Sequence, residues 1–196
     1  RVSAKIACGM HLDEIQIAST VASFEPTIDY VVAKLPRFPF DKFADANRSL
    51  STQMKATGEV MSIGRTYEEA LLKGIRSLEN KVDHVELAFL KEKSLEELFE
   101  FISLHTDERM YALAEALRKG ATVDELHQLT MIDCFFLDKL VKIIEIENEL
   151  KENPWNKEVF IKAKKSGFAD SYIAKVFGST AKEVYEYRKA NNIYPV

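Results

Sequence analysis

The sequence contains no apolar run of about 18 residues, the length that a membrane-spanning helix needs. The first residues, Arg1, Val2 and Ser3, include neither a methionine nor an apolar signal region. We therefore expect a cytoplasmic protein without a membrane partner. We also expect that this chain begins inside a longer protein.

The chain also has few cysteines and no excess of positive charge. Cys8 and Cys134 lie far apart, form no CxxC pair and have no histidine cluster beside them, which predicts reduced, buried thiols. The 27 lysine and arginine residues face 31 aspartate and glutamate residues, for a formal net charge of −4. This balance gives no general attraction to nucleic acid, so we expect no nucleic-acid partner.

Sequence signatures of catalysis are missing. The chain has no GxxxxGK[ST], GxGxxG, GxSxG or HExxH pattern. The histidines stand in polar contexts without metal-ligand spacing, and we expect them at surface or cap positions: His11, His84, His105 and His127. Two carboxylate clusters are expected on solvated helix faces: Glu96, Glu97 and Glu100, and Glu145, Glu147 and Glu149. We therefore predict no catalytic, cofactor-binding or metal-binding residue in this chain.

The clearest strand signals are two short apolar runs, Tyr30 to Leu35 and Val60 to Ile63. They predict an antiparallel pair of strands at about 29–35 and 59–63, whose connection is too long for a tight hairpin. Pro36 is expected to end the first strand because it lacks the N–H that the ladder needs. Before the strands, the pattern predicts a short helix that ends at Gly9 and a helical face over 11–18.

After Thr66 the pattern is helical. A Ser/Thr-x-x-Glu capping box precedes an apolar run at four places: Thr66–Glu69, Ser94–Glu97, Thr122–Glu125 and Thr180–Glu183. Gly120 and Gly167 are predicted to end helices, and the longest helix is expected over 132–150. The chain is thus predicted to be mainly α, with a helical domain after a small α/β part. The polar residues 80–83 mark the expected boundary.

A weak internal repeat has an offset of 47 residues. The matched positions are Gly120, Leu126, Leu129, Leu137 and Leu140 with Gly167, Ile173, Val176, Val184 and Tyr187. Two copies are too few for a solenoid, which leaves a duplicated helical hairpin unit or chance.

The tail from 170 to 191 also fits a helix-turn-helix, in which Lys182, Arg188 and Lys189 would contact DNA. Glu183 and Glu186 on the same helix oppose that interpretation. A free-standing helical interaction module or a helix-turn-helix DNA-binding module is therefore the alternative function.

Two long stretches carry a family resemblance. ASFEPTIDYVVAKLPRF (22–38) and STQMKATGEVMSIGRTYEEALLKGIRSLE (51–79) closely resemble the large subunit of carbamoyl phosphate synthetase. VSAKIACGMHLDEI (2–15) looks like the same family, and LHQLTMIDCFFLDKLVKIIEIE (126–147) is similar to its helical middle domain. The resemblance is weaker over about 80–120 and 152–196.

The resemblance implies a two-part chain. Residues 1–79 would be the C-terminal part of the first, carboxyphosphate-forming ATP-grasp synthetase domain, and residues 80–196 the helical oligomerisation or connector domain. The parent enzyme is a ligase that makes carbamoyl phosphate from bicarbonate, ammonia and two ATP, with Mg or Mn, in arginine or pyrimidine biosynthesis. Its implied partners are the rest of the large subunit, the small glutaminase subunit and a second copy of the helical domain.

One departure from the family limits what this chain can do. The family's nucleotide and metal ligands end in a Glu-Met-Asn-Pro-Arg run, which is absent here. Phosphoryl transfer needs such ligands, so we expect no catalysis by this chain alone and no cofactor within it.

By resemblance, Ile28 and Met54 are candidates for lining the family's internal ammonia and carbamate passage. The alternative is that both residues are core residues under the strand pair. Without the synthetase body, some apolar residues are expected to be partly exposed or covered by a second copy: Val31, Leu35, Phe38 and Phe40.

Overall fold

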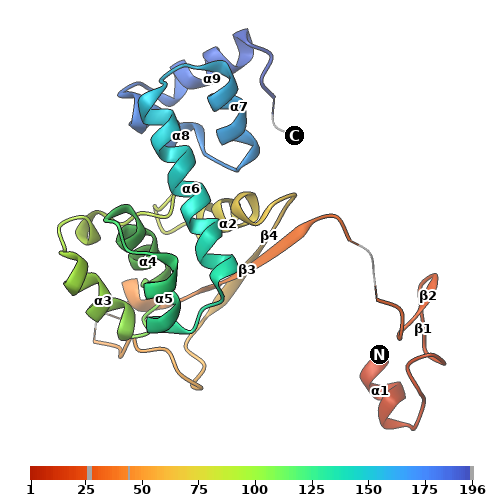
Figure 1. The fold of residues 1–196 in the computed structure, drawn as a ribbon. Coiled ribbons are helices and arrows are strands. Elements are labelled where there is room, and N and C mark those ends of the chain that lie inside the picture. Colours follow the sequence, from red (N-terminus) through yellow and green to blue (C-terminus); the bar gives the residue numbers. More distant parts are fainter. Residues whose placement is uncertain (26–27, 44, 195–196) are drawn as a thin grey trace.

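The N-terminal residues form a short helix and a small hairpin. The computed structural model describes residues 1–25, 28–43 and 45–194 (Figure 1). Helix α1 (Val2–Ala7) is followed by Gly9 at a positive φ, as predicted. The helical face predicted over 11–18 is wrong, because β1 (Gln16–Ile17) pairs there with β2 (Thr20–Val21). The β-branched Ile17 and Thr20 favour this extended pairing over a helix.

The predicted antiparallel strand pair is confirmed. Strand β3 (Val31–Arg37) pairs with β4 (Gly58–Gly64) over the whole length of both strands. Pro36 does not end β3 but lies opposite Glu59 within the ladder. In a two-stranded sheet each strand has one free edge, where a missing N–H breaks no ladder hydrogen bond. A short 3-10 helix, η1 (Pro39–Asp41), follows β3.

Helix α2 (Tyr67–Ser77) packs on the inner face of this sheet. Side chains alternate along the strands, so Leu35 and Ser62 face α2 while Val32 faces outward. The Ser62 hydroxyl lies 2.6 Å from the carbonyl oxygen of Ala70, which joins β4 to α2.

The remaining chain is helical around one long helix. It contains η2 (Ala88–Leu90), α3 (Leu95–Ser103), α4 (Arg109–Arg118), α5 (Val123–Thr130), α6 (Cys134–Glu152), α7 (Lys157–Lys165), α8 (Asp170–Phe177) and α9 (Ala181–Ala190). Figure 1 shows α6 running from the group α3–α5 to the group α7–α9, and α6 packs against α4, α5, α7 and α8. The longest helix therefore lies where the sequence predicted it, with Asp133 as its N-cap.

Three of the four predicted capping boxes are confirmed, at Ser94, Thr122 and Thr180. At Thr66 only half of the box forms. The Thr66 hydroxyl accepts from the Glu69 amide at 3.2 Å, but the Glu69 carboxylate accepts from the Arg65 amide at 2.8 Å and pairs with Lys73. The nearby lysine and the Arg65 amide thus replace the reciprocal bond to the cap residue.

The 47-residue repeat is present in the helix boundaries. Helix α5 spans 123–130 and α8 spans 170–177, while α6 and α9 begin at 134 and 181. The preceding helices α4 and α7 end at 118 and 165, and the glycines that follow, Gly120 and Gly167, both have positive φ. Four boundaries share the offset of 47 residues, although α6 runs on to 152 and α9 ends at 190, and this agreement favours a duplicated helical unit over chance.

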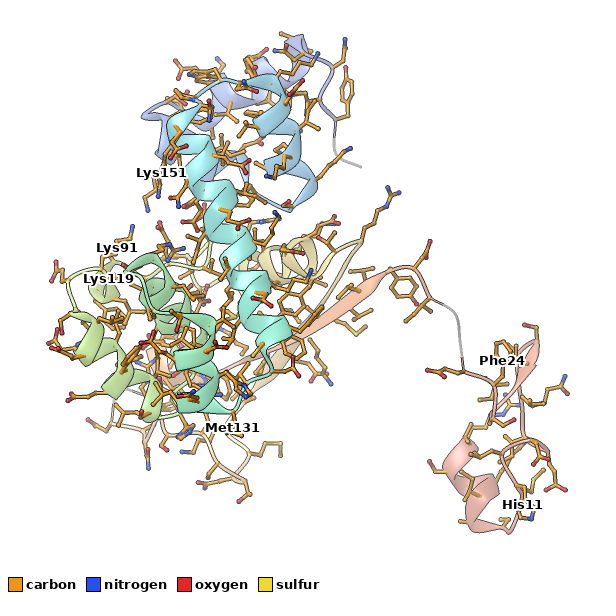
Figure 2. All side chains as sticks on the ribbon, viewed as in Figure 1. His11, Phe24, Lys91, Lys119, Met131 and Lys151 are labelled. Carbon is orange, nitrogen blue, oxygen red and sulfur yellow. The ribbon has the colours of Figure 1, made fainter. Side chains whose placement is uncertain are left out.

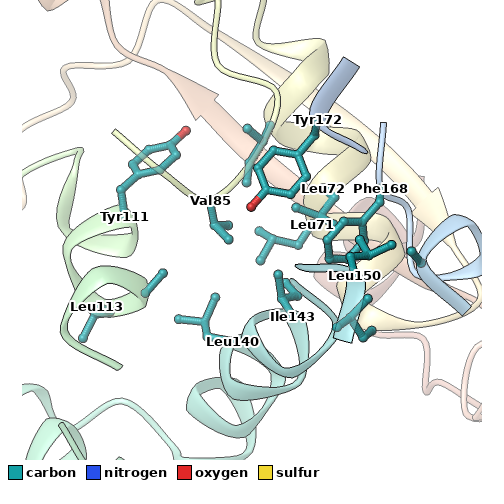
Figure 3. Packing of buried hydrophobic residues seen from close by; sticks show 14 of the residues in the cluster. Leu71, Leu72, Val85, Tyr111, Leu113, Leu140, Ile143, Leu150, Phe168 and Tyr172 are labelled. Atoms are coloured by element: carbon teal, nitrogen blue, oxygen red, sulfur yellow. The ribbon is translucent and has the colours of Figure 1, made fainter. Parts of the chain in front are cut away.

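A continuous apolar core runs from α2 to α9 (Figure 3). Its fully buried members include Leu72 of α2, Ile143 of α6 and Phe168 just before α8. Helix α2 also contacts the second helical unit, which consists of α7, α8 and α9, because Arg76 donates to the Gly167 carbonyl at 2.6 Å. The division into units 1–79 and 80–196 stays a prediction. Within the described ranges, no helix is both long and apolar enough to cross a membrane.

Candidate functional site

A buried ion pair joins α4 to α6. Arg118, the last residue of α4, donates from Nε to Glu147 Oε2 at 2.9 Å and from Nη2 to Oε1 at 2.6 Å. This two-pronged geometry is the strong form of an arginine–carboxylate pair. Glu147 is only 1% exposed, so its predicted place on a solvated helix face is wrong. It lies on the apolar stripe of α6, seven residues after Leu140, and that spacing was the available signal.

His84, in the segment between α2 and η2, is a third member of the network around the Arg118–Glu147 pair. Its Nε2 lies 2.7 Å from Glu147 Oε1, and its ring stacks on Tyr172 with 3.6 Å between centroids. Phe168 packs against the ring as well, at 4.9 Å. His84 is fully buried, so the predicted surface position is wrong. Its polar sequence neighbours gave no sign of the two aromatic rings, which come from more than eighty residues away.

The charges in this network follow from burial and hydrogen bonding. Burial favours the neutral acid of Glu147, but the hydrogen bonds from His84 and Arg118 outweigh it and lower the pKa of Glu147 to about 2. Burial lowers the pKa of His84 despite the adjacent carboxylate, so the imidazole is neutral at pH 7. The neutral ring then donates from Nε2 to Glu147, and its buried Nδ1 has no partner among the residues that the structure describes.

The Arg118 guanidinium has further partners in the same place. It donates from Nη1 to Glu115 at 3.1 Å and from Nη2 to the Val85 carbonyl at 3.0 Å. Burial alone would lower the pKa of Arg118, but the bonds to Glu147 raise it overall. The network thus ties α4, α6, α8 and the 84–86 segment together, and its arrangement is suited to holding these elements rather than to a reaction.

The other sequence-predicted polar residues lie at the surface. His11 and His105 are exposed, and His127 near the end of α5 contacts the Ile132 carbonyl through Nδ1 at 2.7 Å, as expected for a cap position. The predicted burial of the thiols is wrong: Cys8 is exposed and Cys134 is half-buried, and both are free. No group of three or more potential metal ligands occurs among the residues that the structure describes.

Neither candidate for the internal passage lies in the core. Ile28 is 58% exposed and Met54 is 91% exposed, which contradicts the alternative that they pack beneath the strand pair. Pro26 and Thr27, which precede Ile28 in the sequence, lie outside the described residues. A role of Ile28 and Met54 in lining a passage stays a prediction.

The outer face of the β3–β4 sheet is open and carries exposed apolar residues beside the Lys34–Glu59 ion pair. Val32, Met61 and Ile63 are all exposed there, with Met61 at 70%. Val32 and Ile63 are paired across the two strands, so they form one continuous surface. Other apolar residues expected to be partly exposed are indeed half-buried: Val31, Leu35, Phe38 and Phe40.

A second apolar surface lies at the α5–α6 corner, defined here as Leu129, Met131, Phe135 and Phe136. All four residues are exposed, and Met131 is 76% exposed (Figure 2). Met131 has a positive φ and ends α5. The rings of Phe135 and Phe136 pack edge to face, so the corner presents a preformed apolar surface.

Both apolar surfaces fall largely within a segment that matches a known family. The family model described as carbamoyl-phosphate synthetase large chain, oligomerisation domain, matches residues 59–192. This is more than half of the chain. The chain belongs to this family. It is thus a segment of a carbamoyl-phosphate synthetase large chain, and the matched region includes β4 and all helices from α2 to α9. An oligomerisation domain of the synthetase large chain interacts with other parts of the enzyme, which agrees with the open apolar surfaces.

Proposed function

We propose that this chain is the connector of a glutamine-dependent carbamoyl phosphate synthetase large subunit and that it supplies interdomain packing and self-association. The parent enzyme makes carbamoyl phosphate from bicarbonate, ammonia and two ATP. One observation carries the proposal: the region that matches the family, residues 59–192, leaves two apolar surfaces exposed on a well-packed helical core. Open apolar surfaces of this kind mark sites of protein contact.

The outer face of the β3–β4 sheet is the proposed contact with the rest of the large subunit. Burying Met61 and Ile63 there would remove apolar side chains from water, which would stabilise the contact by about 1.5–3 kcal/mol for each fully buried residue. In the intact large subunit, Met61→Lys with Ile63→Lys should reduce bicarbonate-dependent ATP hydrolysis. Glu59→Gln, on the same face, is the control and should leave the activity unchanged. Full activity of the double variant would contradict this contact.

The α5–α6 corner is the proposed contact with a second copy of the chain. Its two phenylalanines and Met131 form an apolar cluster within the matched oligomerisation domain. Phe135→Asp should shift an associated species toward the monomer in size-exclusion chromatography with light scattering. Tyr185→Asp alters an equally exposed aromatic residue on α9 and serves as the control. Equal association of the two variants would place the interface elsewhere.

Catalysis belongs to the parent enzyme, with ATP and Mg or Mn bound by its ATP-grasp domains and ammonia delivered by the small glutaminase subunit. This chain alone is expected to be inactive, and bicarbonate-dependent ATP hydrolysis by the purified chain would contradict that expectation. In the intact enzyme, Ile28→Trp or Met54→Trp is expected to uncouple glutamine hydrolysis from product formation. Complete coupling in both variants would mean that the passage lies elsewhere.

The alternative is a helix-turn-helix DNA-binding module. The two helices and the turn are present, but fewer cations are available for DNA than the three proposed from the sequence. Helices α8 and α9 flank Gly178, which has a positive φ. Arg188, however, pairs with Asp170 at 2.9 Å and its side chain is only 13% exposed, so it is not available to a phosphate. An affinity for duplex DNA that falls steeply with salt would favour this alternative.

A further inference from the structure

A cavity lies beside the buried ionic network, where α4, α6, α8 and the segment around Glu86 meet. Its volume is about 350 Å³. Four cationic side chains line it: Lys91, Lys151, Lys175 and Arg118. Lys91 lies just after η2 and Lys151 near the end of α6 (Figure 2). Three carboxylates also line it, so the cavity wall carries an excess of positive charge.

The three carboxylates already have cationic partners. Glu86 accepts from both Lys91 and Lys175, while Glu115 and Glu147 accept from Arg118. Their capacity to attract a cation is therefore largely used. Two lysines share the single charge of Glu86, which leaves positive charge on that side of the cavity.

Several donors at the cavity have no acceptor. Tyr172 is only 3% exposed, lines the cavity, and its hydroxyl has no hydrogen-bond partner among the described residues. Arg118 uses four of its five N–H groups in the bonds to Glu147, Glu115 and Val85, so one donor remains. Lys151 forms no ion pair with the residues that the structure describes. The Tyr172 hydroxyl opens onto the cavity and is not sealed in the core, so it is available to donate to a ligand there.

We propose that this cavity binds a small tetrahedral oxyanion, either inorganic phosphate or the phosphoryl group of a small metabolite. Tyr172, Arg118 and Lys151 are the donors, with Lys91 and Lys175 at the rim. Three donors that line one cavity, with an excess of positive charge, match the acceptor oxygens of a phosphate. Burial and the charges of Glu147 and Glu86 raise the pKa of Tyr172, so its hydroxyl keeps the proton that it would donate. The proposal is independent of the proposed function.

Binding is tested by isothermal titration calorimetry of this chain with inorganic phosphate and, separately, with glycerol 3-phosphate, at constant ionic strength and pH 7. We expect a Kd on the order of 1 mM for at least one of them, and the tighter ligand identifies the source of the oxyanion. Failure of both to bind at about ten times that concentration would overturn the proposal.

Two variants locate the site. Tyr172→Phe removes only the hydroxyl and keeps the ring that stacks on His84, and Lys151→Gln changes an exposed side chain. Each should weaken binding by about fivefold or more, while Lys182→Gln, an exposed lysine on α9, should not change it. Equal Kd values for Lys151→Gln, Tyr172→Phe and the control would show that the anion binds elsewhere.

Discussion

Removing the charge of Glu147 should destabilise the protein strongly. Glu147→Gln keeps the size and shape of the side chain but replaces one carboxylate oxygen with an amide nitrogen. The single neutral amide oxygen can replace only one of the two carboxylate oxygens, so Arg118 loses the acceptor of either its Nε or its Nη2 bond. Arg118 would remain as a mostly buried cation with only Glu115 as its charged partner.

Two independent routes give the size of the effect. Removing one member of a buried ion pair costs about 3–5 kcal/mol, and the retained amide oxygen places this variant near the lower limit. The pKa of Glu147, lowered from an ordinary 4.5 to about 2, corresponds to about 3 kcal/mol at about 1.4 kcal/mol per pKa unit. Both routes therefore predict a loss of about 3 kcal/mol in the free energy of unfolding at pH 7.

The assay is urea unfolding followed by circular dichroism, with the midpoint and the slope fitted separately. A lower midpoint at unchanged slope reports the stability change. In a chain of this length, a loss of about 3 kcal/mol also lowers the Tm by about 6–12 °C. Glu145→Gln is the matched control, because Glu145 lies on the same helix in an exposed pair with Lys142 and should lose less than about 0.5 kcal/mol. Equal losses in both variants would refute the role of the buried network.

The remaining predictions concern pH and the two turn glycines. The free energy of unfolding should fall as the pH drops below about 7, because the pKa of His84 is lower in the folded chain and the unfolded chain therefore binds a proton at His84 first. It should fall further between about pH 5 and 2, where Glu147 is protonated in the unfolded chain but ionised in the folded one. Urea midpoints at a series of pH values check this, and a flat profile from pH 7 to 4 would contradict it. Gly167→Ala should cost about 3 kcal/mol and Gly120→Ala about 1 kcal/mol, because both have positive φ but only at Gly167 would a Cβ lie 2.9 Å from the backbone of Glu69. Similar Tm values for the two alanine variants would contradict this close packing of α2 on the α7–α8 turn.

The sequence was informative wherever local chemistry determines local structure. Side-chain capping depends on residues three positions apart, so the boxes at Ser94, Thr122 and Thr180 were predictable. The glycine turns and the 47-residue repeat were readable for the same reason, since each depends on short segments with a fixed spacing.

The buried network was not predictable from local pattern, because it depends on tertiary contacts. His84 has polar neighbours in the sequence, and its burial results from Phe168 and Tyr172 of the second helical unit. Pro36 was expected to end a strand by a rule that holds for central strands, whereas a two-stranded sheet has free edges. The cavity beside Tyr172 also needs four separate elements to meet, and no spacing in the sequence reports that.

The central claim is that this synthetase segment brings protein surfaces together, and its molar mass in solution tests that claim most directly. Light scattering of the unmodified chain, measured over a concentration series, should give a mass that rises above the monomer value of 22.4 kDa as concentration increases. A constant mass of 22.4 kDa at every concentration would contradict the claim that the segment self-associates.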